Sequence, residues 1–173
     1  MSHIMIDLET MSTKPNAAIV AIGAVEFSKE GLGREFYVTV TLSSNEEYGR
    51  HVSASTIMWW LEQSNEARKE LTNAKVGLQE ALELFSVFVR SVKPTGVWGN
   101  GAGFDNVVLR EAYSAVFTEN SEPWPFYADR CYRTIRNLTD HRAVKFDGEK
   151  HNALSDAKHQ AKIMLSKEII CHL

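Results

Sequence analysis

The first apolar run of the chain ends in two acidic residues, and this feature restricts the fold more than any other. The run His3-Ile4-Met5-Ile6 is typical of a buried strand, and Asp7-Leu8-Glu9 follows it directly. Residues two apart in an extended chain point to the same face, so the two carboxylates would lie side by side. Like charges at this spacing repel each other and raise each other's pKa. Neither Lys nor Arg occurs before Lys14, so the predicted counter-charge is a divalent metal ion.

Length, charge and cysteine content limit the class of protein. The 173 residues predict one domain, residues 1–173. A net charge of −3 gives no overall basic signature of nucleic-acid binding, although a local patch or a bound metal can supply positive charge. Two cysteines, Cys131 and Cys171, are too few for a disulfide framework or a zinc site, so we expect reduced thiols and a cytoplasmic location. We expect no signal peptide and no membrane span, because the acidic pair interrupts the apolar run and no other run is long enough.

Hydrophobic patterning predicts three strands, and then helices that alternate with short strands. The three strands are expected to form an antiparallel meander. The expected strands are residues 3–8, 17–27 and 34–42, with short strands in 96–101 and 123–130. The expected helices are one that begins near Ser53 or Ser55 and others at residues 78–92, 104–117, 129–138 and 152–170. This order predicts an α/β fold with a mixed sheet, the meander plus parallel strands, flanked by helices.

Acidic residues occur at three predicted edges of this structure. Asp7 and Glu9 end the first strand, Asp105 opens a helix after a glycine-rich loop, and His151 and Asp156 lie at the start of the last helix. Functional groups gather at strand ends in open α/β sheets, so we expect these clusters to meet. Carboxylates without a neighbouring Lys or Arg suit hard cations such as Mg²⁺ or Mn²⁺.

Each of these features also has a purely structural interpretation. An acidic pair such as Asp7 and Glu9 is common at turns, and Asp105 could simply cap the helix that follows it. A histidine near a helix start, such as His151, is commonly a surface residue. The combination of all three in this order is what favours a catalytic site.

The segments IDLET, NGAGFD and HNALSDA resemble the three exonuclease motifs of the DnaQ-like DEDD superfamily. His151 places the resemblance in the histidine branch, DEDDh, and the match runs from residue 4 to about residue 165. The segment STIMWWLEQ is similar to a branch of small bacterial and phage 3′-5′ exoribonuclease-like proteins. The resemblance implies an RNase H-like fold and a metal-dependent 3′-5′ exonuclease.

The same resemblance implies roles for five residues. Asp7, Glu9, Asp105 and Asp156 would hold two Mg²⁺ or Mn²⁺ ions, one lowering the pKa of the attacking water and the other stabilising the leaving 3′ oxygen. His151 would be the general base, since an imidazole titrates near neutral pH. The product would be a nucleoside 5′-monophosphate.

Substrate contacts are expected around the first motif and from exposed aromatic residues. In the superfamily the backbone after the D-x-E motif lies against the terminal nucleotide, and aromatic rings hold single strands by stacking on bases. The expected contact residues are Thr10, Met11, Trp59, Trp60, Gln63, Asn100 and Phe104. Trp59 and Trp60 are adjacent on a helix and point in different directions, so at least one of them is expected in the core.

Basic residues concentrate in the stretch that leads into His151. They would deliver phosphates toward the metals, or they form an ordinary solvated face diluted by acidic residues. These residues are Arg130, Arg133, Arg136, Arg142, Lys145 and Lys150.

Three functional hypotheses remain open at this level. The leading one is a 3′-5′ exonuclease acting on single-stranded nucleic acid or 3′ overhangs, with RNA favoured and DNA as the alternative, because discrimination depends on contacts to the 2′-OH. The second is a non-catalytic nucleic-acid-binding module, and the third is a small-molecule metallo-phosphohydrolase. The sequence also leaves a homodimer open.

Overall fold

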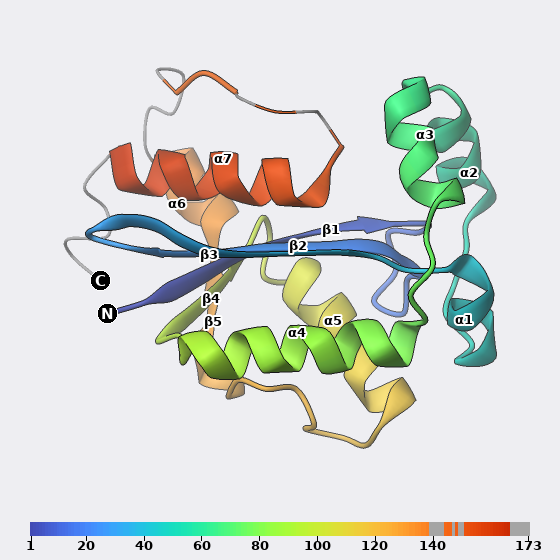
Figure 1. Cartoon of the computed structure of the whole chain (residues 1–173), viewed down its shortest axis with the longest axis horizontal. Coiled ribbons are helices and arrows are strands. Elements are labelled where there is room, and N and C mark those ends of the chain that lie inside the picture. Colours follow the sequence, from blue (N-terminus) through green and yellow to red (C-terminus); the bar gives the residue numbers. More distant parts are fainter. Residues whose placement is uncertain (139–143, 147, 149–150, 167–173) are drawn as a thin grey trace.

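The computed structural model describes residues 1–138, 144–146, 148 and 151–166. A five-stranded mixed sheet in the order β3-β2-β1-β4-β5 forms its centre (Figure 1). The strands β1, β2 and β3 form the predicted antiparallel meander, and β4 and β5 add parallel strands beside β1. Their bounds are β1 His3–Thr10, β2 Ile19–Ser28, β3 Gly31–Thr39, β4 Gly96–Gly99 and β5 Asp129–Cys131. The predicted mixed α/β sheet flanked by helices is confirmed.

Helices cover both faces of the sheet and one end of it. In Figure 1, α4 and α5 lie on one face, α6 and α7 lie on the other, and α1, α2 and α3 gather at the end toward which β1 points. The helix bounds are α1 Leu42–Glu47, α2 Ala54–Leu61, α3 Asn65–Thr72, α4 Leu78–Val92, α5 Asp105–Val116, α6 Tyr132–Leu138 and α7 Ala153–Ser166, with a short 3-10 turn η1 at Phe126–Ala128. Within the described part of the chain, no helix has the length and apolar character needed to cross a membrane.

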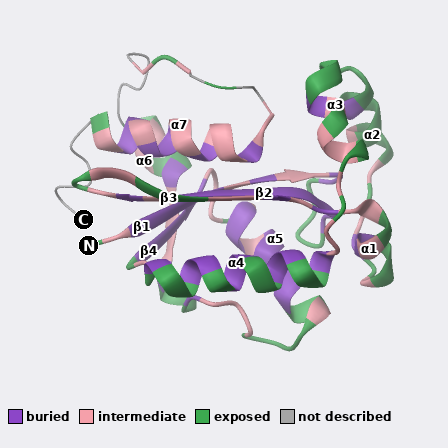
Figure 2. Ribbon diagram, in the orientation of Figure 1, coloured by how far each residue is buried: buried purple, intermediate pink, exposed green. Residues whose placement is uncertain are grey.

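Alternation along β1 divides its side chains between two cores. Ile4, Ile6 and Leu8 belong to the core under α4 and α5, whereas Met5 belongs to the core under α6 and α7. Both β1 and β2 are buried along most of their length (Figure 2). Because side chains alternate with a period of two, Asp7 and Glu9 follow Met5 onto the α7 face. The alternation of apolar residues along β1 therefore determines the face of the sheet toward which Asp7 and Glu9 point.

Several element boundaries differ from the sequence predictions. The third strand begins at Gly31, the residue that leaves the turn with a φ of 122°. The segment after Ser53 forms two helices, because Ser64 starts α3 by accepting a hydrogen bond from the Ala67 amide at 3.1 Å. Ser53 occupies the N-cap position of α2, but its side chain makes no capping hydrogen bond. The helix expected at residues 129–138 begins only at Tyr132, since β5 precedes it.

The helix α1 was not predicted, and a tertiary contact accounts for it. The buried side chain of Asn45 accepts from the Ile19 amide at 2.8 Å and donates to the Ile19 carbonyl at 2.9 Å. These bonds fix α1 against the start of β2, which the local sequence does not encode. The predictions that concern Arg142, Lys150, Cys171 and the end of the last helix, residues 167–170, fall outside the described residues.

Candidate active site

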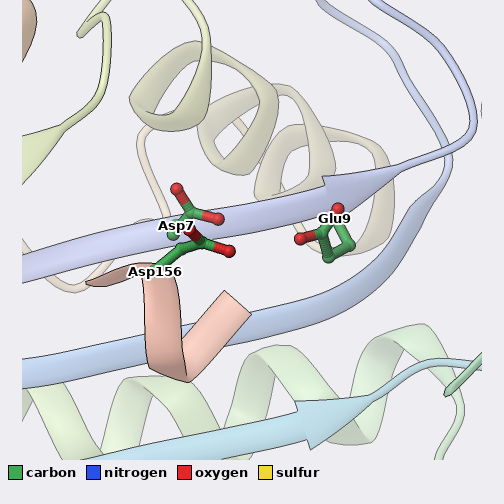
Figure 3. Close-up of side chains that lie close together, drawn as sticks. All are labelled: Asp7, Glu9 and Asp156. Carbon is green, nitrogen blue, oxygen red and sulfur yellow. The ribbon is translucent and has the colours of Figure 1, made fainter. Parts of the chain in front are cut away.

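Three carboxylates from two elements meet beside the end of β1. Asp7 and Glu9 project from β1, and Asp156 projects from the first turn of α7 (Figure 3). One oxygen from each of the three lies within 4.8 Å of the others. Glu9 and Asp156 are far apart in the sequence, and the packing of α7 across β1 and β2 brings their side chains together. This cluster can offer several oxygen ligands to one region of space.

Asp105 approaches the same region from α5. It is the first residue of that helix and is buried, with 3% of its surface exposed. Its Oδ1 accepts a hydrogen bond from the Leu8 amide at 3.3 Å, which ties it to the strand between Asp7 and Glu9. The Asn100 backbone also lowers the pKa of the Asp105 carboxyl. The structure therefore brings together all four acidic residues that the motifs selected.

The electrostatics of this group oppose ionisation. Burial is the largest cause that raises the pKa of Asp7, and the charges of Asp105 and Glu9 raise it further. Burial, followed by the charge of Asp156, raises the pKa of Glu9 to about 8. Burial raises the pKa of Asp105 to about 7, although hydrogen bonds from backbone amides oppose the rise. Nearby positive charge is needed to keep these acids ionised at neutral pH.

Two glycines allow the helix starts to approach the sheet. Gly23 is paired with Asp7 in the antiparallel register, and a Cβ at Gly23 would lie only 2.2 Å from the Ala153 carbonyl carbon of α7. Gly99, at the end of β4, would place a Cβ 2.9 Å from the Asp105 Cβ. Contacts this short exclude any side chain larger than hydrogen. The two glycines therefore position Asp156 and Asp105 respectively.

Gln160 is a further member of the site that the sequence reasoning missed. Its Nε2 donates to Asp7 Oδ1 at 2.7 Å, and the residue is 6% exposed. Its Oε1 is buried and has no hydrogen-bond partner among the described residues. The sequence did contain a signal for Gln160: it lies four residues after Asp156, which places both side chains on the same face of the helix.

His151 lies at the entrance to α7, two residues before the helix begins. Its backbone has a φ of 62°, and its amide donates to Asp156 Oδ2 at 3.1 Å. The imidazole packs edge-to-face against Trp59, with ring centroids 5.0 Å apart and an interplanar angle of 88°. His151 is therefore held from two sides, by the α7 carboxylate and by an aromatic ring of α2.

A cavity of about 370 Å³ adjoins the acidic cluster. Glu9 and Thr10 of β1 line it together with Trp59 and Phe104, which supply aromatic walls. Leu8 and four residues that carry hydroxyl groups complete its lining. The hydroxyl groups belong to Ser12, Thr13, Ser55 and Thr56. An aromatic slot with a polar rim next to carboxylates has the chemistry to hold a nucleoside.

The remaining predicted contact residues have other surroundings. Trp60 is 2% exposed and donates its indole Nε1–H to the Thr10 carbonyl at 3.0 Å, and Met11 is buried in the same small core at the end of the sheet. Gln63 donates to the Trp59 carbonyl at 2.8 Å. Asn100 lies in the loop before α5, where its carbonyl accepts from Arg133. Trp60 and Met11 therefore pack in the core next to Thr10, and a contact of either residue with substrate stays a prediction.

The fold and the acidic cluster define the class of protein. The chain is similar to cell-death related nuclease 4 (TM-score 0.63, 12% identity, covering 97% of this chain and 63% of that chain). It is also similar to E. coli exonuclease I in complex with a dT13 oligonucleotide (TM-score 0.64, 12% identity, covering 96% of this chain and 41% of that chain). The complex of the same enzyme with a dA16 oligonucleotide gives a TM-score of 0.66 at 10% identity, covering 97% of this chain and 41% of that chain. These likenesses confirm the predicted RNase H-like fold. The chain spans 41% to 63% of the length of these three structures.

The sequence also identifies the family within that class. Residues 2–167 match the family described as the 3′-5′ exoribonuclease Rv2179c-like domain. The match covers most of the chain, so the protein belongs to this family. The resemblance to DnaQ-like exonucleases drawn from three short motifs is thereby confirmed. A comparison with curated proteins found no match.

Proposed function

We propose that residues 1–173 form a single, metal-dependent 3′-5′ exonuclease domain. Its substrate is single-stranded nucleic acid or a 3′ overhang, with RNA favoured, and its product is a nucleoside 5′-monophosphate. One observation carries the proposal: oxygens of Asp7, Glu9 and Asp156 lie within 4.8 Å of one another beside a cavity lined by aromatic residues. Membership of an exoribonuclease family supports it independently.

The side chains present fit hard divalent cations. All the clustered donors are oxygens, and the raised pKa values of Asp7, Glu9 and Asp105 indicate that positive charge is required there. We propose that these residues and Asp156 hold two Mg²⁺ or Mn²⁺ ions. When bound, such ions lower the pKa of water and neutralise charge on phosphate oxygens. Gln160 fixes the orientation of Asp7 through the 2.7 Å hydrogen bond to its Oδ1.

His151 supplies the base. It accepts a proton from the water that attacks phosphorus, and the bond from phosphorus to the 3′ oxygen of the preceding nucleotide breaks. Trp59 holds the imidazole in place through its edge-to-face contact. The cavity takes the terminal nucleoside, with Trp59 and Phe104 beside the base and Thr10 at the backbone next to Glu9.

Digestion of labelled oligonucleotides tests this function. With Mg²⁺ or Mn²⁺, the wild-type protein should shorten 5′-labelled RNA stepwise, and matched DNA strands, single or with 3′ overhangs, measure the sugar preference. Asp7→Ala and His151→Ala should each lower the rate at least about a hundredfold, the scale of a lost catalytic group. Glu119→Ala removes an exposed acid after α5 and is the matched control, so its rate should equal that of the wild type.

Three outcomes would count against the proposal. Stepwise shortening that survives Asp7→Ala or His151→Ala would contradict the assigned chemistry. Binding of oligonucleotide without release of mononucleotide would favour a non-catalytic binding module. Equal or faster digestion of DNA would favour the alternative of a DNA exonuclease. The homodimer and the cytoplasmic location stay predictions from the sequence.

A further inference from the structure

Arg133 lies at the edge of the sheet that carries the acidic cluster. β5 ends at Cys131, which is paired with Gly99 at the end of β4, and α6 begins directly afterwards. This order places Arg133, in the first turn of α6, beside the loop that leads from β4 to Asp105. The residue is exposed to solvent. A cation at this position faces the same edge as the proposed active site.

Two contacts hold the Arg133 guanidinium against the loop. Its Nη2 donates to the Asn100 carbonyl at 2.6 Å. Its planar group also lies against Gly101, where a Cβ would be 3.3 Å from Arg133 Cζ. The Asn100 backbone and the charge of Arg133 both lower the pKa of the Asp105 carboxyl. The guanidinium is therefore held at the loop that leads to Asp105, and no carboxylate of the cluster forms a direct ion pair with it among the described residues.

Three other described arginines are engaged elsewhere. Arg110 forms ion pairs with Glu122 and Asp129. Arg50 is buried and donates to two backbone carbonyls. Arg130 lies near Gly96, at the opposite end of β4, and donates to backbone carbonyls close to it in sequence. Of the basic stretch that precedes His151, Arg133 thus has a contact to the Asp105 loop that Arg130 lacks.

We propose that Arg133 binds the phosphate next to the scissile one in the nucleic-acid strand. The scissile phosphate has to lie at the carboxylates, and Arg133 is displaced from them by the Asn100 loop, so a neighbouring phosphate is its partner. A guanidinium has five N–H donors, and the bond to Asn100 uses one of them, so others remain for phosphate oxygens. This inference rests on the proposed exonuclease function and adds a binding position to it.

The test compares two substrates that differ in the number of phosphates. A single-stranded oligonucleotide has the neighbouring phosphate, whereas the para-nitrophenyl ester of uridine 5′-monophosphate has only the scissile one. Arg133→Gln should raise KM for the oligonucleotide about tenfold, the size expected for a hydrogen bond to a charged group, and leave its kcat unchanged. Its kcat/KM for the nitrophenyl ester should equal that of the wild type.

A binding measurement provides a second readout. In a His151→Ala background, which slows turnover, adding Arg133→Gln should reduce the slope of log Kd against log salt by about 0.7, as expected for one lost phosphate contact on a single strand. Arg133→Lys keeps the charge and should restore most of the slope. Arg90→Gln removes an exposed arginine from the last turn of α4 on the opposite face, and it should change neither readout.

The possible outcomes distinguish a failure of this inference from a failure of the proposed exonuclease function. An equal loss on both substrates would mean that Arg133 acts only by holding the Asp105 loop, and it would overturn the phosphate assignment. Unchanged KM and salt slope in Arg133→Gln would overturn it as well. A wild-type protein that degrades neither substrate with Mg²⁺ or Mn²⁺ would instead refute the proposed exonuclease, independently of Arg133.

Discussion

Trp59 and Trp60 are neighbours on α2, but their rings have different surroundings. Trp59 is 38% exposed, lines the cavity and packs on His151. Trp60 is buried and donates a hydrogen bond to the Thr10 carbonyl. We expect Trp59→Ala to lower kcat/KM about two- to tenfold, because an aromatic pair contributes about 0.5–1.5 kcal/mol. Trp59→Phe keeps an aromatic edge and should retain most of the activity. Steady-state kinetics on labelled RNA measures both variants.

Trp60→Phe is the contrasting variant at the residue scale. It leaves the Thr10 carbonyl without its donor and should lower the free energy of unfolding by about 1–3 kcal/mol in urea denaturation. Its kcat should stay close to that of the wild type. A Trp59→Ala protein with full activity would contradict the role assigned to Trp59 in holding His151.

At the scale of elements, the distance between α7 and β2 positions Asp156. The Ala153 and Leu154 backbone lies where a Cβ of Gly23 would be, at 2.2 to 2.4 Å. A methyl group there must push α7 away from the sheet, because backbone atoms cannot rotate aside. We expect Gly23→Ala to lower the free energy of unfolding by about 1–3 kcal/mol. The displaced Asp156 should also weaken Mn²⁺ binding, which titration calorimetry measures.

Gly103→Ala is the matched control, since a Cβ at Gly103 would meet no atom within 4 Å. Its stability and Mn²⁺ affinity should match those of the wild type. Normal Mn²⁺ affinity in a folded Gly23→Ala protein would show that the approach of α7 does not position the site.

At the scale of the whole molecule, the acidic cluster links stability to pH. The folded-state pKa values of Asp7, Glu9 and Asp105 are raised above the ordinary range of carboxylic acids, Glu9 to about 8 and Asp105 to about 7. The folded protein therefore retains protons that the unfolded chain releases, and stability falls as pH rises through this interval. We expect the Tm of metal-free protein in EDTA to fall between pH 6.5 and pH 8. Mn²⁺ at pH 8 should restore it by binding the ionised carboxylates.

A double variant provides the control for this effect. Asp7→Asn with Glu9→Gln removes two of the titrating groups and should flatten the decrease in Tm. Burial lowers the pKa of His3 below the ordinary histidine value of 6.5, and this group acts in the opposite sense below that pH, so the interval above it is decisive. A metal-free Tm that rises across this interval would contradict the electrostatics of the cluster.

The sequence alone determined the meander, the helix at residues 78–92 and the motif residues that converge at one edge of the sheet. Periodicity encodes these features directly, because a strand alternates with period two and a helix with period 3.6. It also placed Asp7 and Glu9 on one face of β1. The boundaries of α1 and β5 were not encoded in this way, since side-chain bonds from Asn45 and pairing with β4 fix them.

Only the tertiary structure decided which helix covers each face of the sheet and how closely that helix approaches the strands. Gln160, Gly23 and Arg133 acquire their importance from contacts with residues distant in the sequence: Asp7, Ala153 and Asn100 respectively. The division of Trp59 and Trp60 between cavity and core depends in the same way on how α2 docks at the end of the sheet. Local patterning specifies which side of an element is apolar, but the partner that packs there is chosen by the whole chain. The sequence therefore determined the chemistry of this protein, and the packing of its helices decided the geometry.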